Sequence, residues 1–373
     1  MSDRFDLAVV GAGVVGLGLA LAGARRGLKV VVLDRDARAN GASVRNFGFI
    51  TVTGQQRGTC WRRAMRSRDI WAEIAPQAGI DIVHRGLLLA ARRPEAREVI
   101  EAFLRTEMGE GCTALSAAQA RERLPALGGD VAGALWSPHD LRVESREAIP
   151  RLAAWLEAAH GVVIRRGTAV TGVAPGRLDT SAGPVMAERI CVAPGDDFRT
   201  LFADRLDAYR LTRCKLHMMR VADPRLGRLP GSVMTDLSLG RYLGYAELPE
   251  AGALKARLAA EQADHLVHGV HLIVVQSADG SLVVGDSHHY HATPDPFAPD
   301  FIDELILDEY AALFGRAPER VLERWTGTYA SADDRLALID RPDPAIRLVV
   351  VTSGSGASTG FALAEEAVAE LCD

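Results

Sequence analysis

The stretch from Asp6 to Asp36 constrains the fold of this chain more than any other part. It reads DLAVVGAGVVGLGLALAGARRGLKVVVLDRD. Two short apolar runs, residues 7–10 and 29–33, flank a glycine-rich turn and a helix of small residues that extends to about residue 24. Strand, glycine turn, helix and strand within about thirty residues are typical of a βαβ unit that binds a dinucleotide.

The glycines of this unit have separate roles. Gly11 permits the tight turn, Gly13 lets the backbone approach a pyrophosphate, and Gly16 lets the helix pack on the strand. Asp34 ends the second strand, where a carboxylate accepts hydrogen bonds from a ribose diol and repels a 2′-phosphate. The alternative is a close-packed βαβ turn without a ligand.

Composition excludes several classes of protein. The 373 residues exceed one ordinary domain, and we expect about two. A net charge of −5 gives no electrostatic reason to bind nucleic acid or an anionic membrane. The N-terminus runs directly into the first strand without a signal peptide, and no apolar run approaches the roughly eighteen residues of a membrane span. We therefore expect a cytoplasmic protein.

The cysteines do not indicate a disulfide framework or a zinc site. They are odd in number, scattered, and never spaced as CxxC. We expect most of them to be buried as small apolar residues. They are Cys60, Cys112, Cys191, Cys214 and Cys372.

A loop is expected at residues 35–50, where small and polar residues replace the periodic pattern. It leaves the carboxyl end of the second strand, where a doubly wound sheet binds its ligand. Ser43, Arg45 and Asn46 are therefore placed to contact a cofactor or a substrate. The alternative is an ordinary surface turn.

The rest of the chain mixes helices with longer alternating strands. Residues 211–324 favour a mostly antiparallel sheet, and the chain closes with a strand, a glycine turn at 354–360 and a helix. A capping box is expected at Ser116. Helices are expected at 61–77, 95–108, 147–160 and 301–314, a hairpin at 178–188, and a buried strand that runs into a glycine turn at 189–195. Further strands are expected at 80–89, 132–141, 161–173, 215–221, 232–235, 241–247, 269–276, 282–290 and 346–351.

No single nucleophile or paired-carboxylate motif stands out, which is typical of enzymes whose cofactor performs the chemistry. The small residues of the closing turn and the helix after them suit the approach of a flat ring, although a helix-capping loop is the alternative. His288, His289 and His291 give three imidazoles within four residues. No further carboxylate or thiol ligand is identifiable, so a polar-substrate or anion pocket is favoured over a metal, and a surface turn remains open.

Four segments, taken in order, resemble the D-amino-acid oxidase and glycine/sarcosine oxidase family of FAD enzymes. The resemblance covers nearly the whole chain. It implies a Rossmann-like FAD-binding domain (α/β) interleaved with an α+β substrate domain built on a mostly antiparallel sheet. The segments are GAGVVGLGLA from Gly11, residues 40–48, residues 191–195 and residues 356–366. The implied domains are 1–80, 145–210 and 325–373 for FAD, and 81–144 and 211–324 for the substrate.

Shorter motifs are similar to a bacterial subgroup associated with phosphonate breakdown, whose members oxidise N-methylated 2-aminoethylphosphonate. The motifs are residues 45–48, residues 215–218, GDSHHY at 285–290, and residues 329–331.

One departure from the family bears on the substrate. Amino-acid oxidases of the family usually carry an arginine in a G-x-R-P segment that pairs with the substrate carboxylate. Tyr329 stands at that place and supplies no charge, which disfavours a simple amino acid unless Arg335 or Arg45 substitutes. A tetrahedral phosphonate needs several donors instead. The candidate substrate-binding residues are Arg45, Arg241, Tyr242, His288, His289, Tyr290 and Tyr329.

The resemblance also assigns the cofactor residues and implies that FAD is bound without a covalent link, because Cys214 and Cys372 flank the region where related enzymes attach it. The cofactor-binding residues are Gly11, Gly13, Val14, Val15, Gly16, Asp34, Arg35, Ser43, Arg45, Asn46, Phe47, Val170, Gly195, Gly354, Gly356, Ala357, Ser358, Thr359 and Gly360.

The implied reaction is hydride transfer from the carbon beside an amine to the flavin, hydrolysis of the resulting imine to an aldehyde and an amine, and reduction of O2 to H2O2. A pocket that lowers the amine's pKa makes a general base unnecessary. Lys215 is a possible charge near the flavin, or a surface lysine. The alternatives are a glycine/sarcosine oxidase, a nicotinamide or FAD dehydrogenase, and an electron-relay flavoprotein. An aromatic hydroxylase is discounted, because such an enzyme needs glycines after Pro294 and Pro296 and this sequence lacks them.

Overall fold

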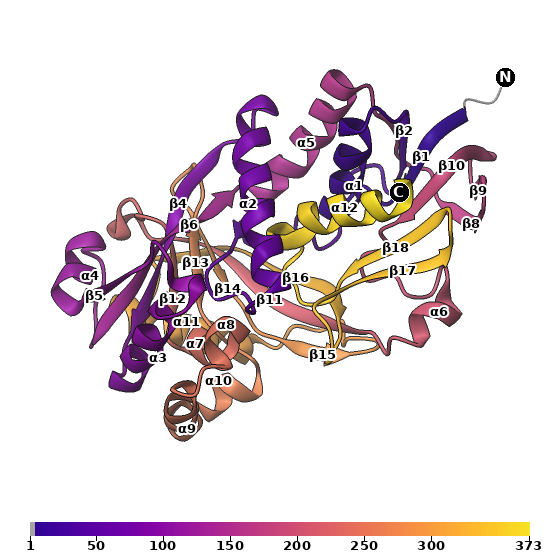
Figure 1. Ribbon diagram of the computed structural model, residues 1–373. Helices are drawn as coiled ribbons and strands as arrows, with labels where there is room; N and C mark the ends of the chain where they lie inside the picture. Colours follow the sequence, from indigo (N-terminus) through magenta and orange to yellow (C-terminus); the bar gives the residue numbers. More distant parts are fainter. Residues whose placement is uncertain (1–3) are drawn as a thin grey trace.

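The computed structural model describes residues 4–373 and contains two large sheets (Figure 1). The first sheet has eight strands, and its central strands run parallel. Their carboxyl halves are mostly apolar and buried, as expected of strands covered on both faces. Its main order is β17 (Ala337–Asp343), β18 (Ile346–Val351), β10 (Val185–Val192), β1 (Arg4–Val10), β2 (Val30–Leu33) and β7 (Val163–Arg165). Strand β9 (Arg177–Thr180) also pairs with β10, and β8 (Val170–Ala174) pairs with β9.

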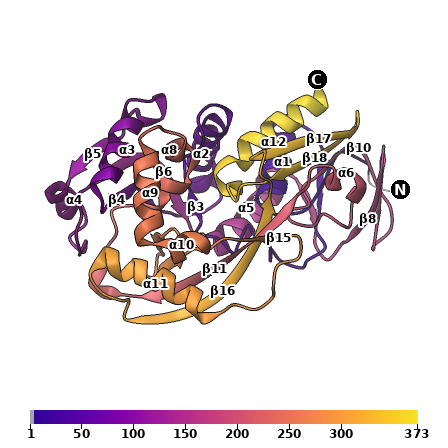
Figure 2. The same ribbon diagram turned by 90° about the horizontal axis from the view of Figure 1, so that it is seen from below.

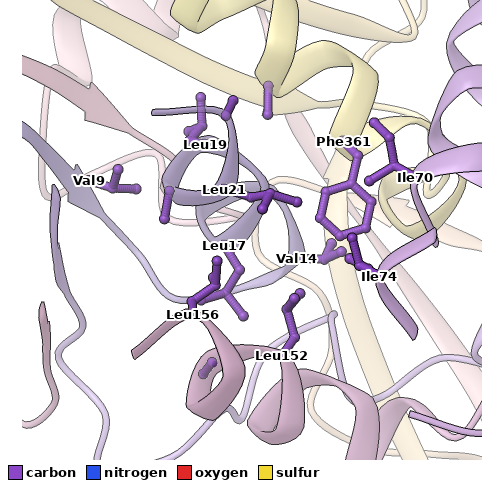
Figure 3. Packing of buried hydrophobic residues seen from close by; sticks show 14 of the residues in the cluster. Val9, Val14, Leu17, Leu19, Leu21, Ile70, Ile74, Leu152, Leu156 and Phe361 are labelled. Carbon is purple, nitrogen blue, oxygen red and sulfur yellow. The ribbon is translucent and has the colours of Figure 1, made fainter. Parts of the chain in front are cut away.

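Helix α1 (Val14–Arg25) lies at the centre of the helical layer on this sheet. It packs against α12 (Gly356–Cys372) and α5 (Ser145–His160), and α12 in turn packs against α2 (Thr59–Gln77). Figure 3 shows side chains from all four helices meeting there, with Phe361 of α12 between α1 and α2. Because neighbours surround α1 on every side, nine of its twelve residues are buried, which explains its small and aliphatic composition.

The second sheet has ten strands and is antiparallel except where β12 pairs with β4. This confirms the mostly antiparallel sheet expected from the sequence. The strands are β3 (Phe49–Ile50), β4 (Ile82–Ala91), β5 (Thr113–Ser116), β6 (Gly133–Val143), β11 (Thr212–Ala222), β12 (Ser232–Thr235), β13 (Ile273–Gln276), β14 (Leu282–Gly285), β15 (His289–His291) and β16 (Arg320–Ser331).

Both faces of the second sheet are covered, and alternate residues of its strands enter different cores. Leu87 and Leu89 of β4 join one hydrophobic cluster, whereas Leu88 joins another. Figure 2 shows α3, α8 and α9 gathered over one part of this sheet. The remaining helices are α3 (Pro94–Leu104), α4 (Ala117–Arg123), α6 (Ala203–Asp207), α7 (Leu237–Arg241), α8 (Leu243–Ala246), α9 (Ala251–Glu261), α10 (Ala263–Val267) and α11 (Asp300–Phe314), with 3-10 turns at Glu107–Gly109 and Pro224–Leu226.

Several expected elements are confirmed and one is wrong. Ser116 and Gln119 form the expected capping box at the start of α4. The strand expected at 241–247 is instead the end of α7 followed by α8. Leu239, Tyr242 and Tyr245 recur every three residues and turn toward one core, so the helical period prevails over the apparent alternation.

The strand expected at 282–290 is interrupted. Strand β14 ends at Gly285 and β15 begins at His289, so residues 286–288 lie outside the ladder. Similarly, the glycine turn expected at 354–360 is shorter, because α12 begins at Gly356. Both differences fall where the sheets meet the cavity described below.

Our division into two interleaved domains remains a proposal, and the two sheets support it. Strand β3 and the end of β16 belong to the second sheet although they lie in ranges that we assigned to the FAD domain. All five cysteines are free thiols, and Cys60, Cys191 and Cys214 are buried. Within residues 4–373, no helix combines the length and the apolar character required to cross a bilayer.

Candidate active site

One cavity of about 650 Å³ extends from the carboxyl ends of β1 and β2 to the second sheet. It brings together most of the residues selected from the sequence. Thr359, Gly360, His289 and Lys215 are the selected residues that do not line it. Those that do are Gly11, Gly13, Val14, Val15, Gly16, Asp34, Arg35, Ser43, Arg45, Asn46, Phe47, Val170, Gly195, Arg241, Tyr242, His288, Tyr290, Tyr329, Gly354, Gly356, Ala357 and Ser358.

The first end of the cavity is the glycine turn before α1. A Cβ on Gly13 would lie 2.9 Å from the hydroxyl oxygen of Ser43, so a side chain there would enter the cavity. The same hydroxyl accepts a hydrogen bond from the backbone N–H of Val14 at 2.9 Å. The N-cap residue Gly13 has no side chain to cap α1, so apart from the Val14 N–H the N-terminus of this twelve-residue helix is left to face the cavity with positive potential. The turn fits the pyrophosphate of a dinucleotide.

Asp34 is held rigidly at the end of β2. One carboxylate oxygen accepts from the N–H of Ala12 at 2.6 Å, and the other accepts from the N–H of Asp36 at 2.8 Å. A carboxylate offers about four acceptor positions, so the remaining ones are available to a ribose diol. Arg35 instead pairs with Asp197 at 2.7 Å.

Internal hydrogen bonds shape the loop at residues 40–48. The Asn46 side chain donates to the carbonyl of Ala42 and accepts from the N–H of Gly48, both at 2.7 Å. The Arg45 guanidinium donates to the side-chain oxygen of Asn40 at 3.0 Å. Asn46 therefore fixes the backbone of the loop, and Arg45 is held beside Asn40.

The closing turn forms another wall of the cavity. Gly354 has a φ of +72°, and a Cβ there would lie 2.8 Å from the Tyr329 ring, so the turn packs directly on that tyrosine. Ser358 accepts from the N–H of Thr51 at 2.9 Å. Thr359 bonds back to Ser355 within α12, which explains why it lies off the cavity wall. The N-terminus of the seventeen-residue α12 supplies positive potential to this side.

Arg241 marks the far pole of the cavity, at the end of α7. Its guanidinium donates to the Tyr290 hydroxyl at 2.8 Å, and within residues 4–373 it forms no ion pair with a carboxylate. Tyr242 and Tyr329 line the same region, and burial raises the pKa of Tyr329 well above its usual value. This pole offers one cation and neutral phenols to a ligand.

Beside that pole lies a buried cluster of Asp286, His271 and His288. The His271 Nδ1 is 3.3 Å from one carboxyl oxygen of Asp286, and the His288 Nε2 is 3.7 Å from the other. Burial raises the pKa of Asp286 to about 8, partly offset by Arg241. Burial also lowers the pKa values of both histidines well below their usual range.

This cluster corrects the expectation that no carboxylate accompanies the histidines. One potential ligand atom from each of its three residues lies within 4.8 Å of the others, which is close enough to hold a cation. The nearby Arg241 guanidinium opposes such a charge. The sequence analysis did not select Asp286 or His271. Asp286 lies within the GDSHHY motif and could have been selected from it, whereas His271 comes close to Asp286 only through the pairing of two strands.

His289 and Lys215 lie on the opposite side of β15 and β11 from the cavity. The His289 ring is 5.9 Å from that of His217, and burial lowers the pKa of His289 to about 4. Lys215 is buried, and its ammonium donates to the carbonyls of Asp295, at 2.7 Å, and Phe297. The expectation of a surface lysine is wrong, and neither residue faces the cavity because neighbours in a strand point to opposite faces.

Comparison with known proteins identifies the family and the fold. The profile of the family described as FAD dependent oxidoreductase (DAO) matches residues 6–371. A glycine oxidase of Geobacillus kaustophilus is 28% identical over 210 residues, which cover 52% of this chain and 55% of that protein. A bifunctional protein ThiO/ThiG of Nostoc sp. is 27% identical over 252 residues, covering 64% of this chain but only 36% of that protein.

Solved structures show the same fold. The glycine oxidase of Geobacillus kaustophilus superposes with a TM-score of 0.77 at 21% identity, covering 99% of this chain and 94% of the other. The L-proline dehydrogenase of P. horikoshii gives a TM-score of 0.78 at 17% identity, with coverages of 98% and 93%. At these identities the likeness concerns the fold alone.

Proposed function

The chain belongs to the DAO family of FAD-dependent oxidoreductases, and on this premise we propose that it oxidises a small amine that carries an anionic group. The cavity supports this proposal because its two ends suit different ligands. The glycine turn and Asp34 suit the adenosine and pyrophosphate parts of FAD, and Arg241 suits an anion at the other end.

The residues along the first part of the cavity fit FAD. Gly13 leaves room for the pyrophosphate, Asp34 for the ribose, and the N-terminus of α12 for the electron-rich edge of the ring. When bound, FAD would accept hydride from the carbon beside the amine nitrogen and pass the electrons to O2, giving H2O2. The protein binds the amine, excludes water and sets its protonation state.

The observation that carries the proposed substrate class is the unpaired guanidinium of Arg241. A partly buried cation without a carboxylate partner costs free energy unless a ligand supplies the opposite charge. Tyr290 orients this guanidinium at 2.8 Å, and the Tyr242 and Tyr329 hydroxyls stand near it. One cation with several phenolic donors suits a tetrahedral phosphonate. We therefore favour an aminophosphonate such as N-methyl-2-aminoethylphosphonate.

The other arginines considered as substitutes are placed less well. Arg335 is paired with Asp334 at 2.7 Å and does not line the cavity. Arg45 lines it but is engaged with Asn40. Arg241 is thus the cation we assign to the substrate.

A glycine- or sarcosine-type substrate is the second candidate. A single guanidinium also pairs with a planar carboxylate, and proteins named glycine oxidase are among the relatives. An FAD dehydrogenase or a relay protein that does not use O2 is the third candidate, since a neighbour in fold is named L-proline dehydrogenase.

A substrate panel separates these candidates. We expect purified protein to release H2O2 with N-methyl-2-aminoethylphosphonate at a kcat/KM at least about tenfold above that with sarcosine or glycine, because one lost donor interaction with the anion costs about 1.4 kcal/mol. 2-Aminoethylphosphonate keeps the phosphonate and tests whether the N-methyl group is required. A preference for sarcosine or glycine would show that Arg241 binds a carboxylate. Amine-dependent reduction of a dye without peroxide would indicate a dehydrogenase.

We also expect FAD to dissociate on denaturation. None of the five cysteines lines the cavity, and burial raises the pKa of the Cys214 thiol to about 11, so the thiolate needed for attachment is scarce. Acid precipitation should leave the yellow colour in the supernatant. A yellow pellet would show a covalent link.

A further inference from the structure

The cluster of Asp286, His271 and His288 has a role that the proposed function alone does not give it. Asp286 lies in the segment that interrupts the ladder between β14 and β15, and it is 5% exposed on the cavity wall. One of its carboxyl oxygens, Oδ1, has no hydrogen-bond partner within residues 4–373. Oδ1 itself is enclosed beside the His271 Nδ1 at 3.3 Å, but the residue lines the cavity, and a buried carboxyl group that is short of hydrogen bonds there is positioned for a ligand.

The hydrogen bonds of His288 define the state of this cluster. Its Nδ1 lies 2.8 Å from the carbonyl of Gly269, which only accepts, so Nδ1 carries the hydrogen. Because burial keeps the ring neutral, Nε2 is then an acceptor, and it faces the Asp286 Oδ2 at 3.7 Å. At 3.7 Å the two atoms form no hydrogen bond, but the lone pair of Nε2 lies beside the carboxyl group and favours the protonated state of Asp286 over the ionised one.

We propose that Asp286 accepts the proton of the substrate's ammonium group, with the neutral rings of His271 and His288 packed beside its carboxyl group. This inference rests on the proposed function. One N–H bond of the ammonium breaks, and one O–H bond forms at Asp286. The amine then has the free lone pair that it needs when hydride leaves the neighbouring carbon for oxidised FAD. The proton passes to solvent when Asp286 ionises again.

The environment matches Asp286 to this proton. An alkyl ammonium has a pKa of about 10.4. The equilibrium constant for proton transfer to an ordinary carboxylate is therefore unfavourable by a factor of roughly 10⁶, whereas for a group with a pKa near 8 the factor is roughly 10². Arg241, Tyr242, His271, His288 and Cys214 are the titratable or charged groups that act on Asp286. Burial dominates over the guanidinium, which gives the raised pKa.

The site also places opposite charges for the two ends of a substrate. Arg241 attracts the anion, and ionised Asp286 attracts the ammonium. A zwitterionic amine therefore neutralises both groups on binding, whereas a simple amine leaves the guanidinium unpaired.

The test is anaerobic flavin reduction by the holoenzyme across pH 6–10, using the best amine of the panel, in wild type and D286N. We expect the wild-type rate constant to rise with pH and level off above about 8, as Asp286 ionises. In D286N it should be about 10²-fold lower at pH 7 and still rise toward the pKa of the free amine. D286E should recover part of the loss, and D334N, at an exposed carboxyl, should match the wild type.

A second readout does not depend on turnover. The quaternary analogue 2-(trimethylammonio)ethylphosphonate has no ammonium proton to donate, and its binding is followed through the flavin spectrum. As pH rises through 8, its Kd should fall roughly tenfold more in wild type than in D286N, where only the second ionisation of the phosphonate still changes the affinity. Identical pH profiles for wild type and D286N in both assays would overturn the role of Asp286.

Two other outcomes are separable. If no amine reduces the wild-type flavin, the proposed function fails, whereas equal reduction in wild type and D286N defeats only this inference. If dialysis against EDTA abolishes reduction and one equivalent of a divalent metal restores it, the three residues are a cation site, and the proton-transfer role is wrong.

Discussion

Arg241→Ala is expected to lower kcat/KM for the anionic amine by about 10²–10³-fold while the FAD content stays at the wild-type level. The truncation removes the unpaired cation at the far pole of the cavity and leaves the substrate anion buried without a partner. Loss of one member of such a pair costs about 2–5 kcal/mol. Most of the effect should fall on KM, because the anion is charged before and after hydride transfer.

The matched control is Arg335→Ala, which removes a guanidinium that pairs with Asp334 outside the cavity. It should change kcat/KM less than about twofold. Arg241→Lys keeps the positive charge but loses the planar, two-pronged donor group of the guanidinium, so its kcat/KM should lie between those of the wild type and Arg241→Ala. A wild-type KM in Arg241→Ala would remove this residue from the substrate site.

Gly13→Val is expected to yield a folded protein that retains less than about a tenth of the wild-type FAD. Gly13 has a φ of −76°, which valine adopts without strain. Its new Cβ would lie 2.9 Å from the Ser43 hydroxyl, the end of a short side chain, and the added methyl groups would extend toward the space assigned to the pyrophosphate. A lost phosphate contact of several kcal/mol corresponds to at least about a hundredfold weaker binding.

The readouts are the flavin-to-protein absorbance ratio and the far-ultraviolet circular dichroism of the purified protein. Gly252→Val is the control, because that glycine lies in α9 with open space around it and away from the cavity. Its FAD content should equal the wild type. A fully loaded Gly13→Val protein would contradict the placement of the pyrophosphate at this turn.

The cofactor end was predictable because its signals are local in the sequence. Gly11 to Asp34 form one βαβ unit in which turn, helix and terminal acid follow one another within a single motif, and each has the expected position. The closing turn was recognised for the same reason, although its helix begins at Gly356.

The substrate end depends on contacts between distant segments, so the sequence defined it less well. His271 meets Asp286 because Ile273 and Gly285 pair across β13 and β14, and nothing in either segment alone reveals that pairing. Arg241 was chosen as a strand residue and occupies the end of a helix instead.

Side-chain direction was the other source of error. His288 lies in the interruption of the ladder and faces the cavity, whereas His289 begins β15 and points to the other face with Lys215. If a strand begins one residue earlier or later than expected, each of its side chains points to the opposite face of the sheet. The triplet of histidines therefore indicated the right region without identifying its functional member.

The central claim is that one cavity joins FAD at the glycine turn to an anionic amine between Arg241 and Asp286. Its most direct test is anaerobic mixing of the purified yellow protein with N-methyl-2-aminoethylphosphonate, followed by admission of O2. We expect the flavin band to bleach in a single phase, to return with O2, and to yield one H2O2 per flavin, faster than with sarcosine at equal concentration. A flavin that stays oxidised with the phosphonate but bleaches with sarcosine or glycine would contradict the account.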